Sequence, residues 1–406
     1  MAGAQKFSAL YFKDFRLFWV GQIISLSGTW MQTVVQSWLV YSLTKSALHL
    51  GIVASLAALP ILVFSLLGGH FADIYPKRNI IITTQVLSII PALSLGLLTD
   101  YGVVRFWHIA LAALFLGTIN AFDIPARQAF MFDLVGRGDI TNAIALNSAA
   151  FNGARIAGPA IAGIIIAKVG IPACFYINAV SFVPVVAALL SVKARGVSEI
   201  SERSSMLGGI AEGWSFVLEE KKIFYILCLI AVLSLFGIPY AALLPVLAAE
   251  VLSGGSDTFS ALVAAGGAGS LTAAVAIAFK GEIKNKKLFM PSAAMLFSLS
   301  LFILSLSKNQ YLSMSLVFAI GFGIVSFLAT ANGFIQQRVS DALRGRVMSL
   351  YTLVFLGFAP LGNSLIGLSA HNIGTVASIG LFAAVCIAGT IVLMRLFINE
   401  YRGGAV

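Results

Sequence analysis

Long apolar runs alternate with short polar segments along almost the whole chain. A helical run of about 20 apolar residues matches the hydrocarbon core of a bilayer, and strands of a membrane barrel are only about half as long. The pattern predicts twelve membrane-spanning helices, at residues 15–42, 46–70, 78–99, 106–132, 140–167, 171–192, 222–249, 256–279, 288–306, 310–337, 343–369 and 373–396. We therefore expect an all-α membrane protein with twelve transmembrane helices.

The longest polar stretch between these runs divides the twelve helices into six and six. The predicted units are an N-terminal half at 1–192, a cytoplasmic linker at 193–221 and a C-terminal half at 222–406. The two halves are weakly similar in sequence, for example at Asn120–Arg127 and Asn332–Arg338. This similarity indicates an internal repeat and hence two pseudo-symmetric bundles. Within the linker, Ser204–Glu220 has an apolar face. It suits either an amphipathic helix on the membrane surface or a simple connection.

Composition and charge placement agree with a membrane protein. Hydrophobic residues make up 59% of the chain and charged residues 10%, and a soluble protein this apolar would expose large patches. The net charge is +10, yet the loops on one side hold only four basic residues, Lys45, Arg105, Lys168 and Lys308. The basic-rich side, with both termini, is expected to be cytoplasmic in a cell inner membrane. The surplus of positive charge on that side predicts contact with the lipid bilayer and not with nucleic acid.

The first predicted helix carries a polar stripe. Its members are Gln22, Ser25, Thr29, Gln32 and Gln36. At 100° per residue they fall within about an 80° arc, and such a stripe faces lipid only at high cost. It therefore lines either a water-filled cavity or a hydrogen-bonded contact between helices.

The fifth predicted helix has a second polar face, formed by Ser148, Asn152, Arg155 and Pro159. Arg155 is the only basic residue well inside a span, and a charge at that depth is costly unless it is hydrated or paired. Three interpretations stay open for it: a cavity cation for an anionic substrate, a buried ion-pair partner, or a position nearer the interface. Candidate cavity residues in the C-terminal half are Asn332 and Gln336.

Asp123 is the only carboxylate placed inside a predicted span. Arg127 follows it by four residues, a spacing that allows an ion pair along one helix. The pair is either a structural salt bridge or a proton-coupling site. The sequence has no phosphate-binding loop of the G-x-x-x-x-G-K-[ST] type. We find no catalytic or metal-binding set, and we expect no enzyme activity and no cofactor.

The segment Gly69–Ile80 has the pattern G-x-x-A-D-x-x-x-K-R between two apolar runs. It resembles the signature loop of the major facilitator superfamily, which implies two six-helix bundles and solute transport. The resemblance implies a charge network that latches the cytoplasmic ends, formed by Asp73, Lys77, Arg78, Arg127 and Asp133. Asp73 would accept hydrogen bonds from the start of the eleventh span and form an ion pair with Arg127. Lys77 or Arg78 would form an ion pair with Asp133 or Asp123. Gly69 would allow close helix approach. The alternative is a solvated loop that only sets topology.

The run Gly153–Gly163 resembles the glycine-proline motif of exporters in that superfamily. Its helix-softening residues are Gly153, Gly158, Pro159 and Gly163. The stretch Asn120–Gly163 resembles the branch that contains enterobactin (siderophore) exporters and multidrug permeases. The resemblance implies efflux coupled to proton antiport. The chain departs from drug–proton antiporters in carrying Gly117–Asn120 where they have an arginine motif.

We accordingly predict a secondary active transporter that exports a hydrophobic or amphipathic small molecule by alternating access. A proton gradient is the expected energy source, and the functional form is expected to be a monomer. The predicted cavity is formed by Ser25, Thr29, Gln32, Gln36, Asn152, Arg155, Asn332 and Gln336. Alternatives are a lysophospholipid flippase or facilitator, an uptake carrier, and a non-transporting receptor or scaffold.

Overall fold

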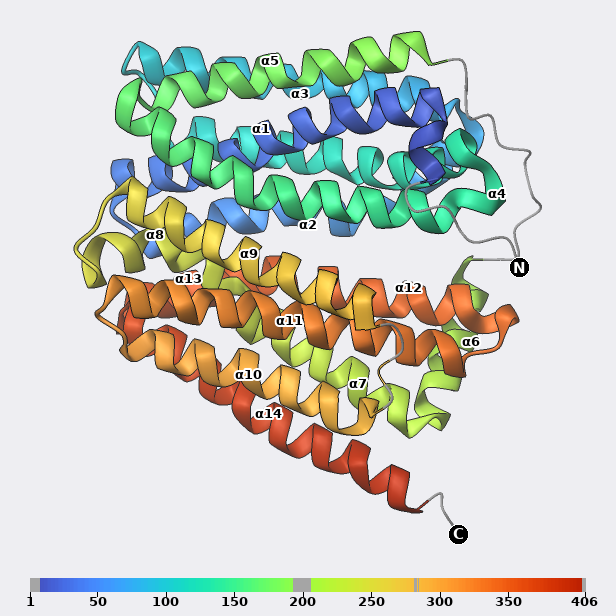
Figure 1. The fold of residues 1–406 in the computed structure, drawn as a ribbon. Helices are drawn as coiled ribbons and strands as arrows, with labels where there is room; N and C mark the ends of the chain where they lie inside the picture. Colours follow the sequence, from blue (N-terminus) through green and yellow to red (C-terminus); the bar gives the residue numbers. More distant parts are fainter. Residues whose placement is uncertain (1–7, 193–205, 281–282, 284, 404–406) are drawn as a thin grey trace. The chain divides into compact units, whose positions relative to one another are not determined.

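The computed structural model describes residues 8–192, 206–280, 283 and 285–403, and nearly all of them are helical (Figure 1). The first half contains η1 (Ser8–Tyr11), α1 (Lys13–Thr44), α2 (Ala47–Ile74), α3 (Lys77–Asp100), α4 (Phe106–Lys168) and α5 (Ile171–Ser191). The second half contains α6 (Met206–Glu219), α7 (Lys221–Val232), η2 (Leu233–Gly237), η3 (Ile238–Leu243), α8 (Leu244–Val246), η4 (Leu247–Val251), α9 (Ser256–Lys280), α10 (Lys286–Leu306), α11 (Gln310–Arg338), α12 (Asp341–Gly357), α13 (Ala359–Ile373) and α14 (Thr375–Gly403).

The predicted all-α membrane fold is confirmed. Within the described ranges, eleven helices are long and apolar enough to cross a membrane. The remaining long helix, α1, holds the polar stripe, and those polar side chains lower its hydropathy. Most helices run a few residues past the predicted spans because their polar ends continue the helical backbone.

Four of the predicted spans depart from separate, regular α-helices. Spans four and five are joined in α4 by a single turn at Gly136, whose φ of 70° is one that glycine adopts without strain. The seventh span runs from α7 to η4 and includes two π-helical turns and one 3₁₀ segment. Pro239 and Pro245 lie in that stretch, and neither can donate a backbone hydrogen bond. The eleventh span is divided at Phe358 into α12 and α13, with Pro360 at the start of α13.

Contacts group the chain into two units. The first comprises Met1–Lys45, Leu56–Ser201 and Phe259–Ala264, and the second comprises Ser46–Ser55, Glu202–Thr258 and Ala265–Val406. The start of α2 thus groups with the second unit and part of α9 with the first. The predicted boundaries at 192 and 222 remain a prediction.

In the first unit, α1 packs against α4 and α5, and α3 packs against the same two helices (Figure 1). Aromatic rings fill the space between them. Phe18 of α1 meets Phe130 of α4 edge to face, with ring centroids 5.7 Å apart, and both side chains are fully buried. Such a contact contributes about 0.5–1.5 kcal/mol beyond the area it buries. This packing fixes which faces of α1 and α4 meet.

In the second unit, α10 packs against α11 and α14, and α6 packs against α12. The helix predicted at Ser204–Glu220 is present as α6, and the preceding residues 193–205 lie outside the described part. On α6, Val217 is buried whereas Trp214 is exposed. Glu212 pairs with Arg346 of α12, which ties the helix to the bundle.

Candidate functional site

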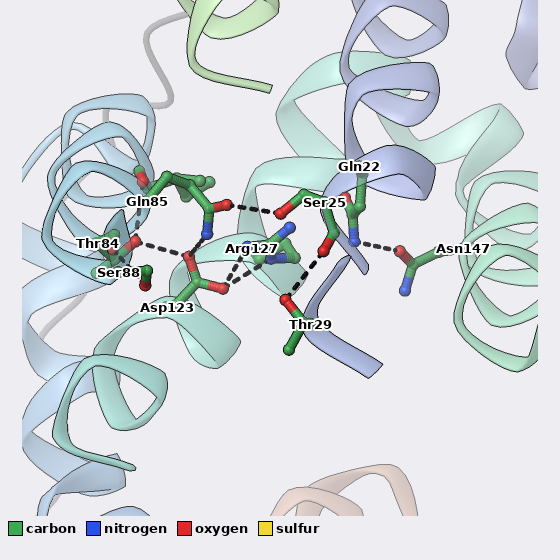
Figure 2. Close-up of polar contacts among 10 residues, drawn as sticks. Gln22, Ser25, Thr29, Thr84, Gln85, Ser88, Asp123, Arg127 and Asn147 are labelled. Atoms are coloured by element: carbon green, nitrogen blue, oxygen red, sulfur yellow. Dashed lines mark hydrogen bonds and ion pairs between the residues drawn. The ribbon is translucent and has the colours of Figure 1, made fainter. Parts of the chain in front are cut away.

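A buried polar network connects α1, α3 and α4 in the first unit (Figure 2). The Asp123 carboxylate is its centre and accepts four hydrogen bonds. Its Oδ2 accepts from Arg127 Nε at 2.8 Å, and its Oδ1 accepts from Thr84 Oγ1 at 2.7 Å and Gln85 Nε2 at 3.1 Å. The predicted ion pair along the helix is therefore confirmed, and its role in proton coupling stays a prediction.

Gln85 extends this network to α1. Its Oε1 accepts from Ser25 Oγ at 3.1 Å, so the two ends of one amide join Asp123 to α1. One turn earlier on α1, Gln22 donates to Asn147 Oδ1 of α4 at 3.0 Å (Figure 2). Because an unmatched polar group is costly away from water, this network specifies how the three helices fit together.

The polar stripe of α1 divides into two sets. Gln22, Ser25 and Gln32 are buried and bind side chains of neighbouring helices. Gln32 accepts from Asn178 Nδ2 of α5 at 2.6 Å. Thr29 is exposed and Gln36 is half-buried. Of the four α1 positions that were predicted to line a cavity, Ser25 and Gln32 therefore contact neighbouring helices, and only Thr29 and Gln36 keep accessible side chains.

Arg155 belongs to a cation–aromatic cluster between α4 and α1. Its guanidinium carbon lies 5.4 Å from the ring centroid of Trp30, and Trp30 meets Phe151 edge to face at 5.5 Å. Arg155 and Trp30 are half-buried and Phe151 is exposed. Asn152 lies beside Arg155 and donates to the Ser148 carbonyl at 2.8 Å. The cluster is a candidate binding site.

The glycine-proline motif packs directly against this cluster. A Cβ at Gly158 would lie 2.6 Å from Trp30 Cβ and 2.7 Å from the Ser27 carbonyl oxygen, so α4 and α1 approach closely there. At Gly153 a Cβ would meet nothing within 4 Å, and at Gly163 it would meet Ser260 at 3.3 Å. Non-helical dihedrals inside α4 occur at Gly136. Softening of the helix by Pro159 stays a prediction.

At the ends of the helices that were predicted to be cytoplasmic, the predicted pairing of Lys77 with Asp133 is present, with Nζ 3.1 Å from Oδ2. Arg78 donates to the Leu190 carbonyl of α5 at 3.1 Å. Arg127 binds Asp123, and its predicted pairing with Asp73 stays a prediction, as does the contact of Asp73 with the start of α12.

The predicted role of Gly69 in close helix packing is wrong. A Cβ at Gly69 would meet nothing within 4 Å, whereas a Cβ at Gly68 would lie 2.1 Å from the Ala121 carbonyl oxygen of α4. A shift of one residue turns the helix by 100°, so only one of two adjacent glycines can face α4. The predicted loop is also shorter than expected, because α2 continues to Ile74.

In the second unit, Gln336 of α11 donates to Asn332 Oδ1 at 2.6 Å. Gln336 is exposed and Asn332 is half-buried. Sequence reasoning missed the partners of the buried network. Thr84, Gln85 and Ser88 form a polar face on α3 whose spacing could have indicated it. In the described part of the chain, no cluster of His, Cys, Asp or Glu could hold a metal ion.

Comparisons with known proteins agree with this architecture. The chain is 27% identical over 394 residues to the staphyloferrin A transporter of Staphylococcus aureus, covering 95% of this chain and 96% of the relative. It is 22% identical to macrolide efflux protein A of Streptococcus pyogenes, covering 89% of this chain and 90% of that protein.

Solved structures with the same fold are transporters of low sequence identity. A POT family transporter in complex with 5-aminolevulinic acid matches with a TM-score of 0.76 at 12% identity, covering 95% of this chain and 96% of that one. A bacterial homologue of the lysosomal transporter Spinster matches with a TM-score of 0.71 at 12% identity, covering 98% and 99%. At such identities the likeness establishes the fold alone. The family model described as transmembrane secretion effector matches residues 4–403. The chain therefore belongs to this transporter family of the major facilitator superfamily.

Proposed function

We propose that this chain exports a hydrophobic or amphipathic small molecule by alternating access, as a secondary active transporter. The observation that carries the proposal is the half-buried side chain of Arg155, near the middle of the membrane-spanning Gly138–Lys168 segment of α4. A guanidinium at that depth is unfavourable against lipid. It is stable where water, a partner group or a solute reaches it, and ionisable residues at this depth mark transport pathways.

The open polar positions of the first unit supply the rest of the proposed pathway. Thr29 and Gln36 of α1 and Asn152 of α4 keep exposed or half-buried side chains at membrane depth. In the second unit we propose Asn332 and Gln336 for the same role. Ser25 and Gln32 are assigned to holding α1 in place, because their side-chain groups already bind Gln85 and Asn178.

The names of the relatives support outward transport. One relative is named for transport of staphyloferrin A and another for efflux of macrolides, and the family is described as secretion effectors. Both named compounds are therefore suitable probes. We place the protein in a bacterial inner membrane with both termini in the cytoplasm, acting as a monomer without a bound cofactor.

Proton antiport is the proposed energy source, with Asp123 as the coupling group. A proton on Oδ2 would remove the charge that holds Arg127 and would free its guanidinium. Because Oδ1 binds Thr84 and Gln85, the change would also reach α3 and, through Gln85, α1. Protonation at one atom could thus loosen three helices. Asp73, Lys77, Arg78 and Asp133 are proposed to form the cytoplasmic latch with Arg127.

The test is proton flux in proteoliposomes that contain a pH-sensitive dye. Staphyloferrin A, a macrolide and a lysophospholipid are each added to wild type, Asp123→Asn and Asp257→Asn. Asp257 is an exposed carboxylate on α9 and provides a matched control for loss of one negative charge. We expect proton movement triggered by a substrate in wild type and the control, and its loss in Asp123→Asn.

Other outcomes separate the parts of the proposal. Proton movement that persists in Asp123→Asn leaves export in place and removes Asp123 as the coupling group. Solute flux without any proton movement contradicts antiport and favours a facilitator or a lipid flippase. Flux directed inward under an imposed pH gradient identifies an uptake carrier, and the absence of flux for every compound contradicts transport of these classes.

A further inference from the structure

The hydroxyl of Thr84 has two acceptors within hydrogen-bonding distance. Its Oγ1 lies 2.7 Å from Asp123 Oδ1 and 2.8 Å from the carbonyl oxygen of Ile81, three residues earlier on α3. A hydroxyl carries one hydrogen and two lone pairs, so Thr84 donates to one of these oxygens at a time. Rotation about the Cβ–Oγ1 bond therefore exchanges one acceptor for the other.

The other side chains that bind Asp123 present only donors to it. The guanidinium of Arg127 has no acceptor atom. Gln85 turns its Nε2 toward Asp123, and its Oε1 accepts from Ser25 (Figure 2). An ionised carboxylate can only accept, so this orientation of the amide suits the charged form. Among the partners of Asp123 in the described ranges, Thr84 is thus the one whose side-chain atom at the carboxyl group can accept as well as donate.

Burial makes an acceptor necessary if Asp123 is to carry a proton. Asp123, Thr84 and Gln85 are each no more than 5% exposed. A protonated carboxyl is itself a donor, and a buried donor without an acceptor pays the full cost of losing its contact with water. A neutral Asp123 at this position therefore needs an acceptor that belongs to the network.

The charge that acts directly on Asp123 is that of Arg127 on the same helix. The neighbouring helices α1 and α3 contribute uncharged groups to the network, namely Ser25, Thr84 and Gln85. The titratable or charged side chains next along α1, α2, α3 and α5 are Arg16, His70, Arg78 and Tyr176. Hydrogen bonding of Asp123 in its two charge states is accordingly set by Arg127 and these uncharged partners.

We propose that Thr84 is a positioning residue for proton coupling, whose hydroxyl serves both charge states of Asp123. The inference rests on the proposed antiport and makes its proton site more specific. When Asp123 is ionised, Thr84 donates to Oδ1. When a proton binds at Oδ1, the new O–H donates to Thr84 Oγ1, and the Thr84 hydrogen turns to the Ile81 carbonyl. No heavy atom has to move, because both oxygens already lie within 2.8 Å of Oγ1.

The same step reaches the ion pair on α4. The charge of a carboxylate is shared by its two oxygens, so a proton on Oδ1 also neutralises the group that holds Arg127 at Oδ2. Thr84 thus lets Asp123 take up and release a proton while α3 stays in place. The change in charge is passed to Arg127.

The test is infrared spectroscopy of purified protein in detergent, recorded as the difference between low and high pH. The C=O stretching band of a protonated carboxyl moves to higher wavenumber when its O–H loses a hydrogen-bond acceptor. Asp123→Asn removes the band and so identifies it. The variants are Thr84→Val, Thr84→Ser and Thr84→Cys. Thr99→Val is the matched control, because Thr99 lies on the same helix and its hydroxyl donates to the Leu95 carbonyl at 2.6 Å.

Wild type, Thr84→Ser and Thr99→Val are expected to show the Asp123 band at one position, because each keeps a hydroxyl at residue 84. Thr84→Val should move the band to higher wavenumber. Thr84→Cys should move it part of the way, since sulfur is a weak acceptor. Proton flux triggered by staphyloferrin A or a macrolide is measured in proteoliposomes of the same variants. It should fall roughly tenfold in Thr84→Val, the effect of one buried hydrogen bond, and stay near wild type in Thr99→Val.

Three results would overturn the role of Thr84. They are an Asp123 band at the wild-type position in Thr84→Val, an equal shift in Thr99→Val, and proton flux in Thr84→Val that matches wild type. If Thr84→Val fails to fold, a band at the wild-type position in Thr84→Cys decides against the proposal. The infrared band is read without transport. Failure of the antiport, seen as proton flux that persists in Asp123→Asn, is therefore distinguished from failure of the Thr84 hydrogen bond.

Discussion

Two arginines on α4 lie on opposite sides of the turn at Gly136 and meet different surroundings. Arg127 has Asp123 one helical turn before it, and the pair, with side-chain exposures of 13% and 7%, belongs to a network that joins three helices. Arg155 has Phe151 at the corresponding position and lies half-buried against Trp30. The residue four positions earlier thus separates a cation paired with a carboxylate on its own helix from a cation that lies against aromatic rings.

The structural role of the Asp123–Arg127 pair is tested most severely by Asp123→Ala. The substitution leaves the Arg127 guanidinium without its carboxylate in a buried position, and breaking such a pair costs about 3–5 kcal/mol. We expect a large fall in the unfolding free energy, measured by denaturation in mixed detergent micelles. Replacing both members, as Asp123→Leu with Arg127→Met, should recover much of the loss. A single variant as stable as wild type would show that the network does not hold the helices.

The Asp123–Arg127 pair was predictable because its geometry is local. Four residues along one helix bring two side chains together whatever the rest of the fold does. The twelve spans were predictable for a similar reason, since length and apolar composition alone decide whether a helix crosses a bilayer.

The partners of Asp123 on α3 were not predictable in the same way. Thr84 and Gln85 reach Asp123 only because one particular face of α3 packs on α4. That face depends on the fit of side chains along both helices. The division of the α1 stripe has the same origin. Gln32 is buried and accepts a hydrogen bond from Asn178 of α5, whereas Gln36 is only half-buried. The prediction assigned close helix packing to Gly69 and not to Gly68, which is an error of one residue along the helix, or 100° of rotation.

The close packing beneath the second arginine is tested by Gly158→Ala. The new methyl group would lie within 2.8 Å of Trp30, Ser27 and Met31 atoms, part of them backbone, so α1 and α4 must move apart. Overpacking of this kind costs about 1–3 kcal/mol, and displacement of Trp30 should also reduce transport. Gly153→Ala is the matched control, because the added methyl group meets nothing and alanine is the better helix former. Equal effects of the two substitutions would contradict close packing at Gly158.

The division of the α1 stripe is tested by Gln32→Leu against Gln36→Leu. Gln32→Leu removes the acceptor of the Asn178 Nδ2 hydrogen bond and should lower the unfolding free energy by about 1 kcal/mol, a typical value for polar contacts between membrane helices. Gln36→Leu should leave stability near wild type and reduce transport, since its half-buried side chain is assigned to the pathway. The reverse pattern, with stability lost only at Gln36, would assign the two glutamines the opposite roles.

The smallest stability effect is expected for Arg155→Met, within about 0.5 kcal/mol of wild type. The long apolar side chain of methionine keeps contact with Trp30, and the proposed pathway assigns the charge of Arg155 to contact with the solute. Arg127→Met should be clearly less stable by the same denaturation assay, because it leaves the Asp123 charge held only by Thr84 and Gln85. If Arg155→Met were destabilised as strongly as Arg127→Met, Arg155 would be a structural ion like Arg127. A guanidinium that can be removed without loss of stability, and whose removal reduces transport, is one that the protein keeps for its substrate.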